Sequence, residues 1–407
     1  MRVVQYCYTA CVKKEAYCVL TKIVLTNFKS FKNRTEVDFT KTNYAILPQN
    51  VHANGVLKGN IFVGANASGK SNLLLAIKLL PDFLFKEREI NSGLFLCLFG
   101  AEPRFSLEYH FLIDGQTVVY QLEVEPRASL IHELLTCNGI HLMERMGLAA
   151  RSFITDPHGV SHDDKDVPED SLFLRTLYFN TKFSNNPTLS KWMDFLEHSV
   201  YINPFEGLMI SYGKDKMNLE SYLKQDGCEK INHFFDTFGF NQRVDYAHTA
   251  TGSGYRLVAG NNDEDRYIYF RRRGIEQPIP FSEESCGNKN LLRMLPAFLT
   301  VSSHGGLLLI DEFSSGFHNE LEELLVKYFM RVSEHGQMLF VSHSTNLLSN
   351  SILRPDQAYA VEFRGKDGSF VNRFSNQQPR AAQNIEKMYN SGVFGGLPNY
   401  EEPFHET

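Results

Sequence analysis

The sequence predicts an α/β protein with a phosphate-loop core, an antiparallel β-subdomain and a helical insertion. Three observations predict this fold class. A short apolar strand at 59–64 runs directly into a glycine-rich loop and then an apolar helix from Asn72, which we expect Pro81 to end. Two later apolar strands, at 305–313 and 338–343, end in acidic or polar residues. An alternating apolar pattern at 105–124 predicts an antiparallel hairpin.

The composition excludes several classes of protein. A chain of 407 residues, 43% apolar and 22% charged, has the size of two to three domains and is neither fibrous nor mainly disordered. The net charge of −6 gives no overall basic field, so nucleic acid is not an indicated partner, although a local contact stays open. Seven dispersed cysteines favour a reducing cytoplasm over a disulfide framework. The apolar stretch at 93–99 is much shorter than the roughly 20 residues of a spanning helix, so we expect no membrane contact.

Changes in pattern along the chain predict its domain organisation. From Thr21 the chain reads as an edge strand, so residues before it are expected to be an extension, with a natural start near Leu20 and an ordered extra strand as alternatives. A loop-like acidic stretch at 152–170 marks a boundary, and the absence of sustained heptads predicts no long coiled coil. The expected units are an N-terminal extension (1–20), a lobe with the P-loop and β-subdomain (21–150), a mainly helical insertion (151–250) and a C-terminal lobe (251–407).

The alternation at 105–124 also fixes a register. Asp114 and Gly115 form a two-residue turn, so paired residue numbers sum to 229. The expected pairs are Phe111 with Val118, Tyr109 with Tyr120, Leu107 with Leu122, and Phe105 with Val124. All of them lie on one face, so the hairpin has one buried and one solvated side.

Gly64 to Ser71 reads GANASGKS, which has the spacing of a P-loop between a strand and a helix. In such a loop, backbone N–H groups and the helix N-terminus surround phosphates, and glycines let the backbone approach closely. The Lys70 ammonium would neutralise β- and γ-phosphate oxygens of ATP, and the Ser71 hydroxyl would hold Mg²⁺. The residues expected to bind ATP are Gly64, Asn66, Ser68, Gly69, Lys70, Ser71 and Asn72.

The two later strands end in residues suited to nucleotide hydrolysis. GGLLLIDEF at 305–313 contains Asp311, expected to be a second Mg²⁺ ligand, and Glu312, expected to orient or deprotonate the attacking water. The alternative is an acid pair that only caps the next helix. MLFVSH at 338–343 ends in His343, which we interpret as the γ-phosphate sensor because all strands of this set end in polar residues. Lys70, Glu312 and His343 are the predicted catalytic residues.

The order of these motifs resembles that of the ABC-type ATPases. Asp311 follows Lys70 by 241 residues (311 minus 70), far later than in ordinary AAA+ and RecA-type motors. The chain is similar to the SMC/RecF-like and OLD-like group, in which a large insertion separates the two Walker motifs. ESCGN at 284–288 resembles a degenerate form of the family's signature, in which Ser285 and Gly287 match its Ser and second Gly. The resemblance implies that Ser285 and Gly287 bind the γ-phosphate of ATP held by another subunit of a homodimer or higher homo-oligomer.

Further segments are similar to particular members of this group. The loop 314–318 matches the family's loop after Walker B, here the strand at 305–313, and in the family this loop crosses the dimer interface. No residue of the sequence is recognisable as the family's Q-loop. RPDQ at 354–357 and the tail at 384–398 resemble stand-alone prokaryotic ATPases of the RloA and AbiLi abortive-infection type. This similarity covers nearly the whole chain from Thr21.

The resemblance implies a nucleotide-gated dimeric ATPase that binds and hydrolyses ATP and acts as sensor or regulator of an antiviral system. Only 64 residues follow His343 (407 minus 343), so we expect a separate effector protein, a nuclease being one candidate. One alternative is a DNA-repair or chromosome-associated clamp that encloses duplex DNA. A second is a scaffold that binds nucleotide only as a structural element.

The basic run Arg271–Arg273 allows two readings. It is either the solvated end of a hairpin or a contact for a phosphate or a partner near the signature. The sequence alone leaves both open.

Overall fold

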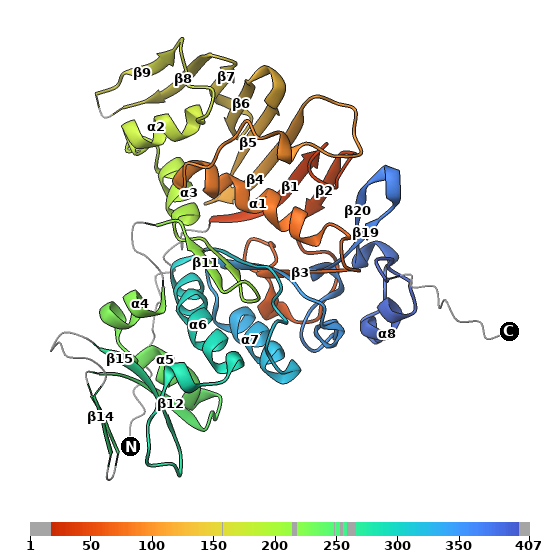
Figure 1. Ribbon diagram of the computed structural model, residues 1–407. Helices are drawn as coiled ribbons and strands as arrows, with labels where there is room; N and C mark the ends of the chain where they lie inside the picture. Colours follow the sequence, from red (N-terminus) through yellow and green to blue (C-terminus); the bar gives the residue numbers. More distant parts are fainter. Residues whose placement is uncertain are drawn as a thin grey trace, which may run out of the picture.

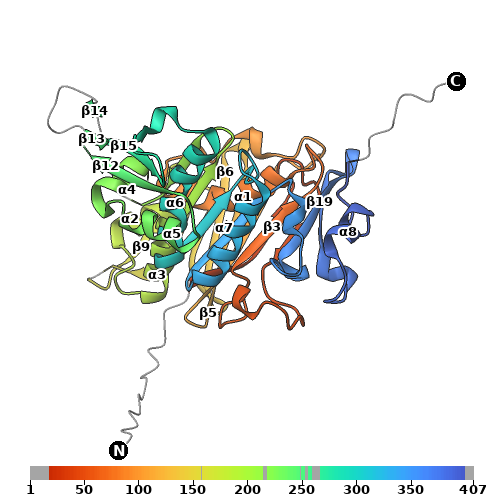
Figure 2. The same ribbon diagram turned by 90° about the horizontal axis from the view of Figure 1, so that it is seen from below.

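The computed structural model describes residues 18–156, 158–213, 218–247, 249–252, 255–258 and 266–398. Within these ranges the chain forms a seven-stranded sheet flanked by helices and an eight-stranded antiparallel sheet (Figure 1). Figure 2 shows β12, β15 and α5 at one end of the molecule and β19 and α8 at the other. The predicted α/β fold class with an antiparallel β-subdomain is confirmed.

The seven-stranded sheet carries the strands that end in the predicted motifs. Its order is β11–β10–β17–β18–β3–β19–β20, and β10, β17, β18, β3 and β19 run parallel. Parallel strands end at the same edge, so the residues after β3, β17 and β18 come together. The strands are β3 (Gly59–Val63), β10 (Val200–Asn203), β11 (Leu208–Ser211), β17 (Gly306–Ile310), β18 (Gly336–Val341), β19 (Ala358–Phe363) and β20 (Ser369–Arg373).

Helices cover both faces of this sheet, because successive side chains of a buried strand point to opposite sides. In β17, Leu307 and Leu309 join a core with helices α1 and α3, whereas Leu308 and Ile310 join a second core with α6 and α7. This double burial explains why the strand reads as a continuous apolar run. The helices are α1 (Lys70–Phe85), α3 (Pro187–Glu197), α6 (Cys286–His304), α7 (Asn319–Val332) and α8 (Ile385–Asn390).

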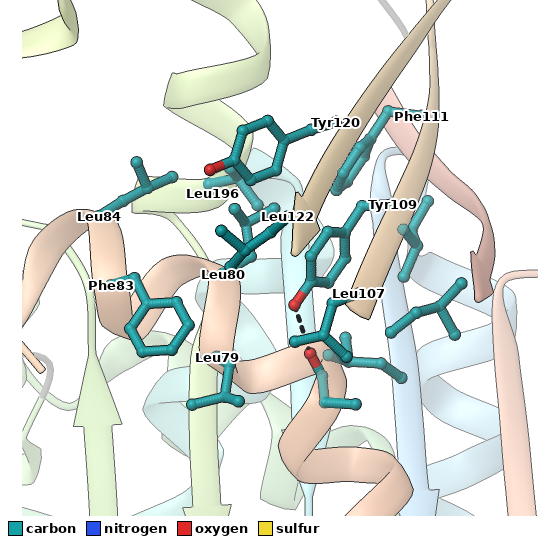
Figure 3. Close-up of a cluster of buried hydrophobic side chains, with 14 of the residues drawn as sticks. Leu79, Leu80, Phe83, Leu84, Leu107, Tyr109, Phe111, Tyr120, Leu122 and Leu196 are labelled. Carbon is teal, nitrogen blue, oxygen red and sulfur yellow. Dashed lines mark hydrogen bonds between the residues drawn. The ribbon is translucent and has the colours of Figure 1, made fainter. Parts of the chain in front are cut away.

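The eight-stranded sheet has the order β2–β1–β4–β5–β6–β7–β8–β9. The predicted register of its central hairpin is confirmed, with Tyr109 opposite Tyr120 and Phe111 opposite Val118. These side chains pack on α1, and the Tyr109 hydroxyl donates to the carbonyl of Ala76, 2.7 Å away (Figure 3). The strands are β1 (Cys18–Thr26), β2 (Thr35–Asp38), β4 (Phe105–Ile113), β5 (Gln116–Glu125), β6 (Leu130–Cys137), β7 (Ile140–Met146), β8 (Ala149–Thr155) and β9 (Ser161–Asp164).

Two local expectations in this lobe are wrong. Strand β1 begins at Cys18 and lies between β2 and β4, so it is not an edge strand. The short polar strand β2, whose sequence TEVD gives little strand signal, occupies the edge instead. Helix α1 passes through Pro81 and ends at Phe85, because burial of Phe83 and Leu84 offsets the hydrogen bond that proline removes. Of the expected extension at 1–20, only residues 18–20 lie within the described residues.

The segment 151–250 is less helical than expected. Strands β8 and β9 extend the antiparallel sheet to residue 164, and β10 and β11 belong to the central sheet. The acidic strand β9 is an edge strand with no buried residue, so it lacks the apolar alternation that marks a strand. Helices occur in two pairs, α2 (Phe173–Thr181) with α3, and α4 (Leu219–Asp226) with α5 (Glu229–Thr237).

Two smaller sheets lie beyond α5. One is formed by β12 (Gln242–Ala247), β15 (Tyr267–Arg272) and β16 (Ile279–Pro280), and the other by β13 (Thr249–Gly252) and β14 (Tyr255–Val258). The longest described helix, α6, has 19 residues, so the described ranges contain no long coiled coil. In the same ranges, no helix has the length and apolarity to span a membrane.

Candidate functional site

The P-loop connects β3 to α1 at the carboxyl edge of the central sheet. Gly69 has a φ of 109°, and an added Cβ would lie 2.5 Å from the Ser369 hydroxyl and 2.6 Å from the Ser30 hydroxyl. Only glycine fits this position, because both the backbone conformation and the surrounding space exclude a side chain. The Ser369 hydroxyl donates to the carbonyl of Ser68, 2.6 Å away, and holds the loop from β20.

The Lys70 ammonium lies inside this loop. Its Nζ donates to the carbonyls of Gly64, at 3.0 Å, and Ala65, at 2.8 Å. Burial lowers the pKa of Lys70, while the nearby Glu312 and Asp311 carboxylates act in the opposite direction. The Ser68 hydroxyl is buried nearby and has no hydrogen-bond partner within the described chain. A buried cation and an unsatisfied hydroxyl in one loop fit a phosphate group.

Ser71 and Asp311 come together although they lie 240 residues apart in the sequence. The Ser71 hydroxyl donates to Asp311 Oδ1 over 3.1 Å. Asp311 directly follows β17 and is buried, and this burial raises the pKa of its carboxyl. A hydroxyl and a carboxylate beside a phosphate loop are hard oxygen donors of the kind that Mg²⁺ prefers. The pair therefore fits a Mg²⁺ ion.

Glu312 and His343 face each other across the ends of β17 and β18. His343 Nε2 lies 3.5 Å from Glu312 Oε2, and the His343 backbone N–H donates to the Ser314 hydroxyl over 3.2 Å. Glu312 has a φ of +56°, a strained conformation for a residue other than glycine. Such strain persists where the surrounding structure imposes it, as it often does at functional sites.

A pocket of about 700 Å³ lies beside most of these groups, whereas Gly64 and Asp311 are not among the residues that line it. Its lining includes Asn66, Ser68, Gly69, Lys70, Ser71, Asn72, Glu312 and His343, together with Ala67 and Phe205. Phe205 was not among the residues predicted from the sequence; it lies in the turn between β10 and β11 and is 78% exposed. A signal for this turn exists, since VYIN at 200–203 is another apolar strand that ends in a polar residue.

Ser285 and Gly287 are not among the residues that line this pocket. Ser285 is the N-cap of α6, and its hydroxyl accepts from the Asn288 N–H over 3.3 Å. A Cβ on Gly287 would lie 2.7 Å from the carbonyl oxygen of Gly316, so α6 begins directly against the loop after β17. Within one chain, the signature-like segment and the P-loop pocket are separate.

Two of the three arginines at 271–273 form ion pairs with carboxylates of the same chain. Arg272 Nη2 contacts both carboxylate oxygens of the buried Glu284, at 2.6 and 2.7 Å, and Arg271 pairs with Asp245. The Glu284 carboxylate also accepts from the Ser285 N–H over 2.9 Å. Arg272 therefore positions the start of α6 from strand β15.

The two C-terminal segments singled out in the sequence make contacts at different places in the fold. The Ala65 N–H donates to the carbonyl of Gly396 over 2.7 Å, which joins the tail at 384–398 directly to the loop. In the RPDQ segment, Arg354 and Asp356 form a buried ion pair at 2.8 Å, and Asp356 also accepts from the Thr42 N–H and hydroxyl. The tail thus supports the site directly, whereas the RPDQ segment packs at the opposite edge of the sheet, where the Gln357 side chain donates to the carbonyl of Gly59 at the start of β3 over 2.6 Å.

The site has a P-loop after β3, acidic residues after β17 and a pocket between them. Together these features define a P-loop nucleoside-triphosphatase. Residues 60–349 match the family described as "AAA domain, putative AbiEii toxin, Type IV TA system", and the chain belongs to this family. The protein is therefore an ATPase with an AAA domain. No curated protein matches the chain.

Several solved structures are similar to the chain at low identity. The SMC head domain from Thermotoga maritima is 15% identical, with a TM-score of 0.46 over 86% of this chain and 97% of that chain. An Smc head bound to the C-winged helix domain of ScpA is 14% identical, with a TM-score of 0.45 over 86% and 96%. An Smc head with an extended coiled coil, bound to a ScpA domain and derived from Pyrococcus furiosus, is 13% identical, with a TM-score of 0.45 over 87% and 96%.

Proposed function

We propose that this ATPase works as a nucleotide-gated dimer in which each ATP is bound by two subunits. In one subunit, Lys70 and the P-loop bind the phosphates, and Ser71 and Asp311 hold Mg²⁺. When bound there, Mg²⁺ would supply positive charge that stabilises the phosphate groups. Glu312 accepts a proton from the attacking water. His343, whose Nε2 lies 3.5 Å from Glu312 Oε2, contacts the γ-phosphate side of the pocket.

The observation that carries the proposal is the separation of the α6 N-terminus from the P-loop pocket. Ser285 and Cys286 are exposed there, and the N-terminus of a 19-residue helix attracts anions. On its own chain the pocket has the N-terminus of α1 but not that of α6, because Ser285 and Gly287 do not line it. A second copy that presents its α6 to the γ-phosphate would complete two equivalent sites, as a two-fold symmetric pair requires.

Light scattering of purified Glu312→Gln with and without Mg-ATP tests this gating. We expect the mass to increase with ATP in Glu312→Gln and to stay constant in Lys70→Ala, which lacks the phosphate-binding ammonium. An unchanged mass in Glu312→Gln at saturating ATP would contradict nucleotide-gated assembly. An equal increase in Lys70→Ala would show that the assembly does not depend on the P-loop.

We further infer that the ATPase regulates a separate effector in a prokaryotic antiviral system of the abortive-infection type, similar to the RloA and AbiLi systems, inside the cytoplasm. The description of the matched family, which names a putative AbiEii toxin and a type IV toxin–antitoxin system, supports this role. The test is phage challenge of the native host carrying wild type, Lys70→Ala or Glu312→Gln, with affinity purification of bound proteins. Protection that requires both residues, and an effector retained by Glu312→Gln, are the expected results. Equal phage sensitivity with and without the gene would contradict this role.

A further inference from the structure

A second pocket, of about 420 Å³, lies between helix α6 and the β10–β11 hairpin, and we call it the α6 pocket. It shares no lining residue with the nucleotide pocket. Its volume lies within the range of roughly 300 to 1,000 Å³ that is usual for pockets that hold small molecules. Most of its wall is apolar, and the lining side chains include Ile202, Leu208, Leu219, Ile268, Phe281 and Met294. Such a wall favours a hydrocarbon group that leaves water.

Two charged side chains, Glu220 and Arg293, line the α6 pocket. The Glu220 carboxylate has a cation beside it on the same helix, because Lys224 Nζ lies 2.7 Å from Glu220 Oε1. The Arg293 guanidinium lies over the ring of Phe281, with its Cζ 5.4 Å from the ring centroid. No described residue accepts a hydrogen bond from Arg293 or forms an ion pair with it. Among the described residues, the pocket therefore carries one positive charge without a carboxylate partner.

Asn290 lies one helical turn before Arg293 and also lines the α6 pocket. Residues three apart on a helix lie on the same face. Asn290 is 7% exposed, and within the described chain its amide Nδ2 has only a long contact of 3.8 Å, with Cys286 Sγ. A buried amide with so little hydrogen bonding is costly unless a ligand or water satisfies it. Together the amide and the guanidinium offer N–H donors that suit one carboxylate or phosphate group.

We propose that the α6 pocket binds a small amphipathic anion, a hydrocarbon chain or ring that carries one carboxylate or phosphate group. The hydrocarbon part packs against the apolar wall, where each buried methylene tightens binding about fourfold. The anionic group accepts hydrogen bonds from Arg293 and Asn290. The apolar wall supplies most of the affinity, and these two side chains supply the specificity for an anion.

The turn between β10 and β11 joins the α6 pocket to the nucleotide pocket. Pro204 and Gly207 line the α6 pocket, whereas Phe205, which lies between them in the chain, lines the nucleotide pocket. A bound anion therefore contacts the same turn that reaches the nucleotide. The binding site goes beyond the proposed gating and holds whether or not the ATPase dimerises.

Isothermal titration calorimetry of the full chain without nucleotide tests the site with four probes. Octanoate and octyl phosphate carry the two candidate anionic groups on the same chain, octan-1-ol lacks the charge, and butanoate lacks half of the chain. We expect at least one of the two eight-carbon anions to bind at least about fivefold more tightly than octan-1-ol, because only an anion pairs with the guanidinium. Octanoate should bind roughly a hundredfold more tightly than butanoate, which has four methylenes fewer to bury.

The tighter of the two eight-carbon anions identifies the anionic group that the site prefers. Binding of octan-1-ol as tight as that of both anions would overturn the proposal, because the pocket would then be only an apolar surface. The absence of binding of either anion at about 1 mM would also overturn it.

Arg293→Gln tests the assigned cation. Because Arg293 is exposed and forms no ion pair with a described residue, the variant should stay folded. The Kd of the preferred anion should rise roughly five- to tenfold, while the Kd of octan-1-ol stays unchanged. Arg331→Gln makes the same change at an exposed site of α7 outside the pocket and should leave both values unchanged. Equal affinities of the two variants for the anion would overturn the assignment of Arg293.

Methionine methyl groups locate the bound anion. Met209 and Met294 line the α6 pocket, whereas Met330 lies in α7 and does not line it. In ¹³C-methyl NMR spectra the preferred anion should shift the signals of Met209 and Met294 and leave that of Met330 unchanged. A shift of Met330 without shifts of the other two would place the anion elsewhere and overturn the proposal. These measurements involve no nucleotide, so failure here and failure of the proposed gating are distinguishable.

Discussion

Glu312→Gln removes the proposed base while keeping the shape of the side chain. The Glu312 carboxylate is 34% exposed and lies 3.5 Å from His343 Nε2. Among the described residues, no side chain or backbone group donates a hydrogen bond to it. The hydrogen bonds of Lys70 with the P-loop and of Ser71 with Asp311 do not involve Glu312 and are kept in this variant. We therefore expect the fold and ATP binding to survive and the chemical step to fail.

The size of the effect follows from the role assigned to the carboxylate. A positioned general base contributes roughly 10²- to 10⁴-fold to the rate, or about 3 to 5 kcal/mol of the barrier. The exposed pair with His343 contributes at most about 1 kcal/mol to the free energy of unfolding. The variant should thus lose at least about a hundredfold in kcat with little change in thermal stability.

Phosphate release at saturating Mg-ATP measures this loss, with nucleotide affinity and the melting temperature recorded on the same preparation. Glu320→Gln, an exposed carboxylate in the first turn of α7 that does not line the pocket, is the matched control. A kcat of Glu312→Gln within about tenfold of wild type would refute the assignment of the base. An equal loss of kcat in Glu320→Gln would show that the effect is not specific to Glu312.

Three further perturbations test the surroundings of the site and the stability of the lobes. Gly396→Ala places a methyl group 3.2 Å from a neighbouring carbonyl oxygen beside the P-loop, at a φ of +77°. Its Kd for ATP should rise roughly three- to tenfold, whereas Gly392→Ala, at a φ of +82°, should leave the Kd unchanged. Burial lowers the pKa of His52 from 6.5 to about 4. The unfolded state then binds more protons between these values, so the free energy of unfolding should fall by about 3 kcal/mol as pH drops through this window. Urea titrations of His52→Phe should lack this pH dependence. If the variant and the wild type had the same pH profile, His52 would not be the cause of the dependence. The buried Glu133 carboxylate forms an ion pair with the buried Arg145 guanidinium and accepts hydrogen bonds from two backbone N–H groups where α2 begins. Glu133→Ala should lower the free energy of unfolding by about 3 to 5 kcal/mol in urea titrations, and a loss below about 1 kcal/mol would contradict this.

The fold was predictable wherever apolar periodicity and turn chemistry agree. The hairpin at 105–124 has alternating residues on both sides of a two-residue turn, so its register followed from the sequence. Strands β2 and β9 were not predictable in the same way, because edge strands with exposed polar side chains carry no alternation. The continuation of α1 beyond Pro81 depends on the tertiary burial of Phe83 and Leu84, which no local pattern contains.

The candidate site was predictable as a set of residues but not as a surface. The sequence located the P-loop, Asp311, Glu312 and His343, because each follows a strongly apolar strand. The apolar strand at 200–203 was visible in the sequence, but nothing in the sequence indicates that β10 pairs with β17, about a hundred residues further along the chain. This pairing places Phe205 at the pocket. The support of the P-loop by Gly396 is likewise a long-range contact.

A mixture of two inactive variants tests most directly whether ATP is bound between two copies of the chain. Lys70→Ala lacks the phosphate-binding ammonium, and Ser285→Arg places a bulky side chain at the exposed start of α6. Each variant alone should be inactive. In an equimolar mixture half of the dimers are mixed and each contains one intact composite site, so roughly a quarter of the wild-type ATPase activity should return. A mixture that stays inactive, or wild-type turnover by Ser285→Arg alone, would contradict the shared site.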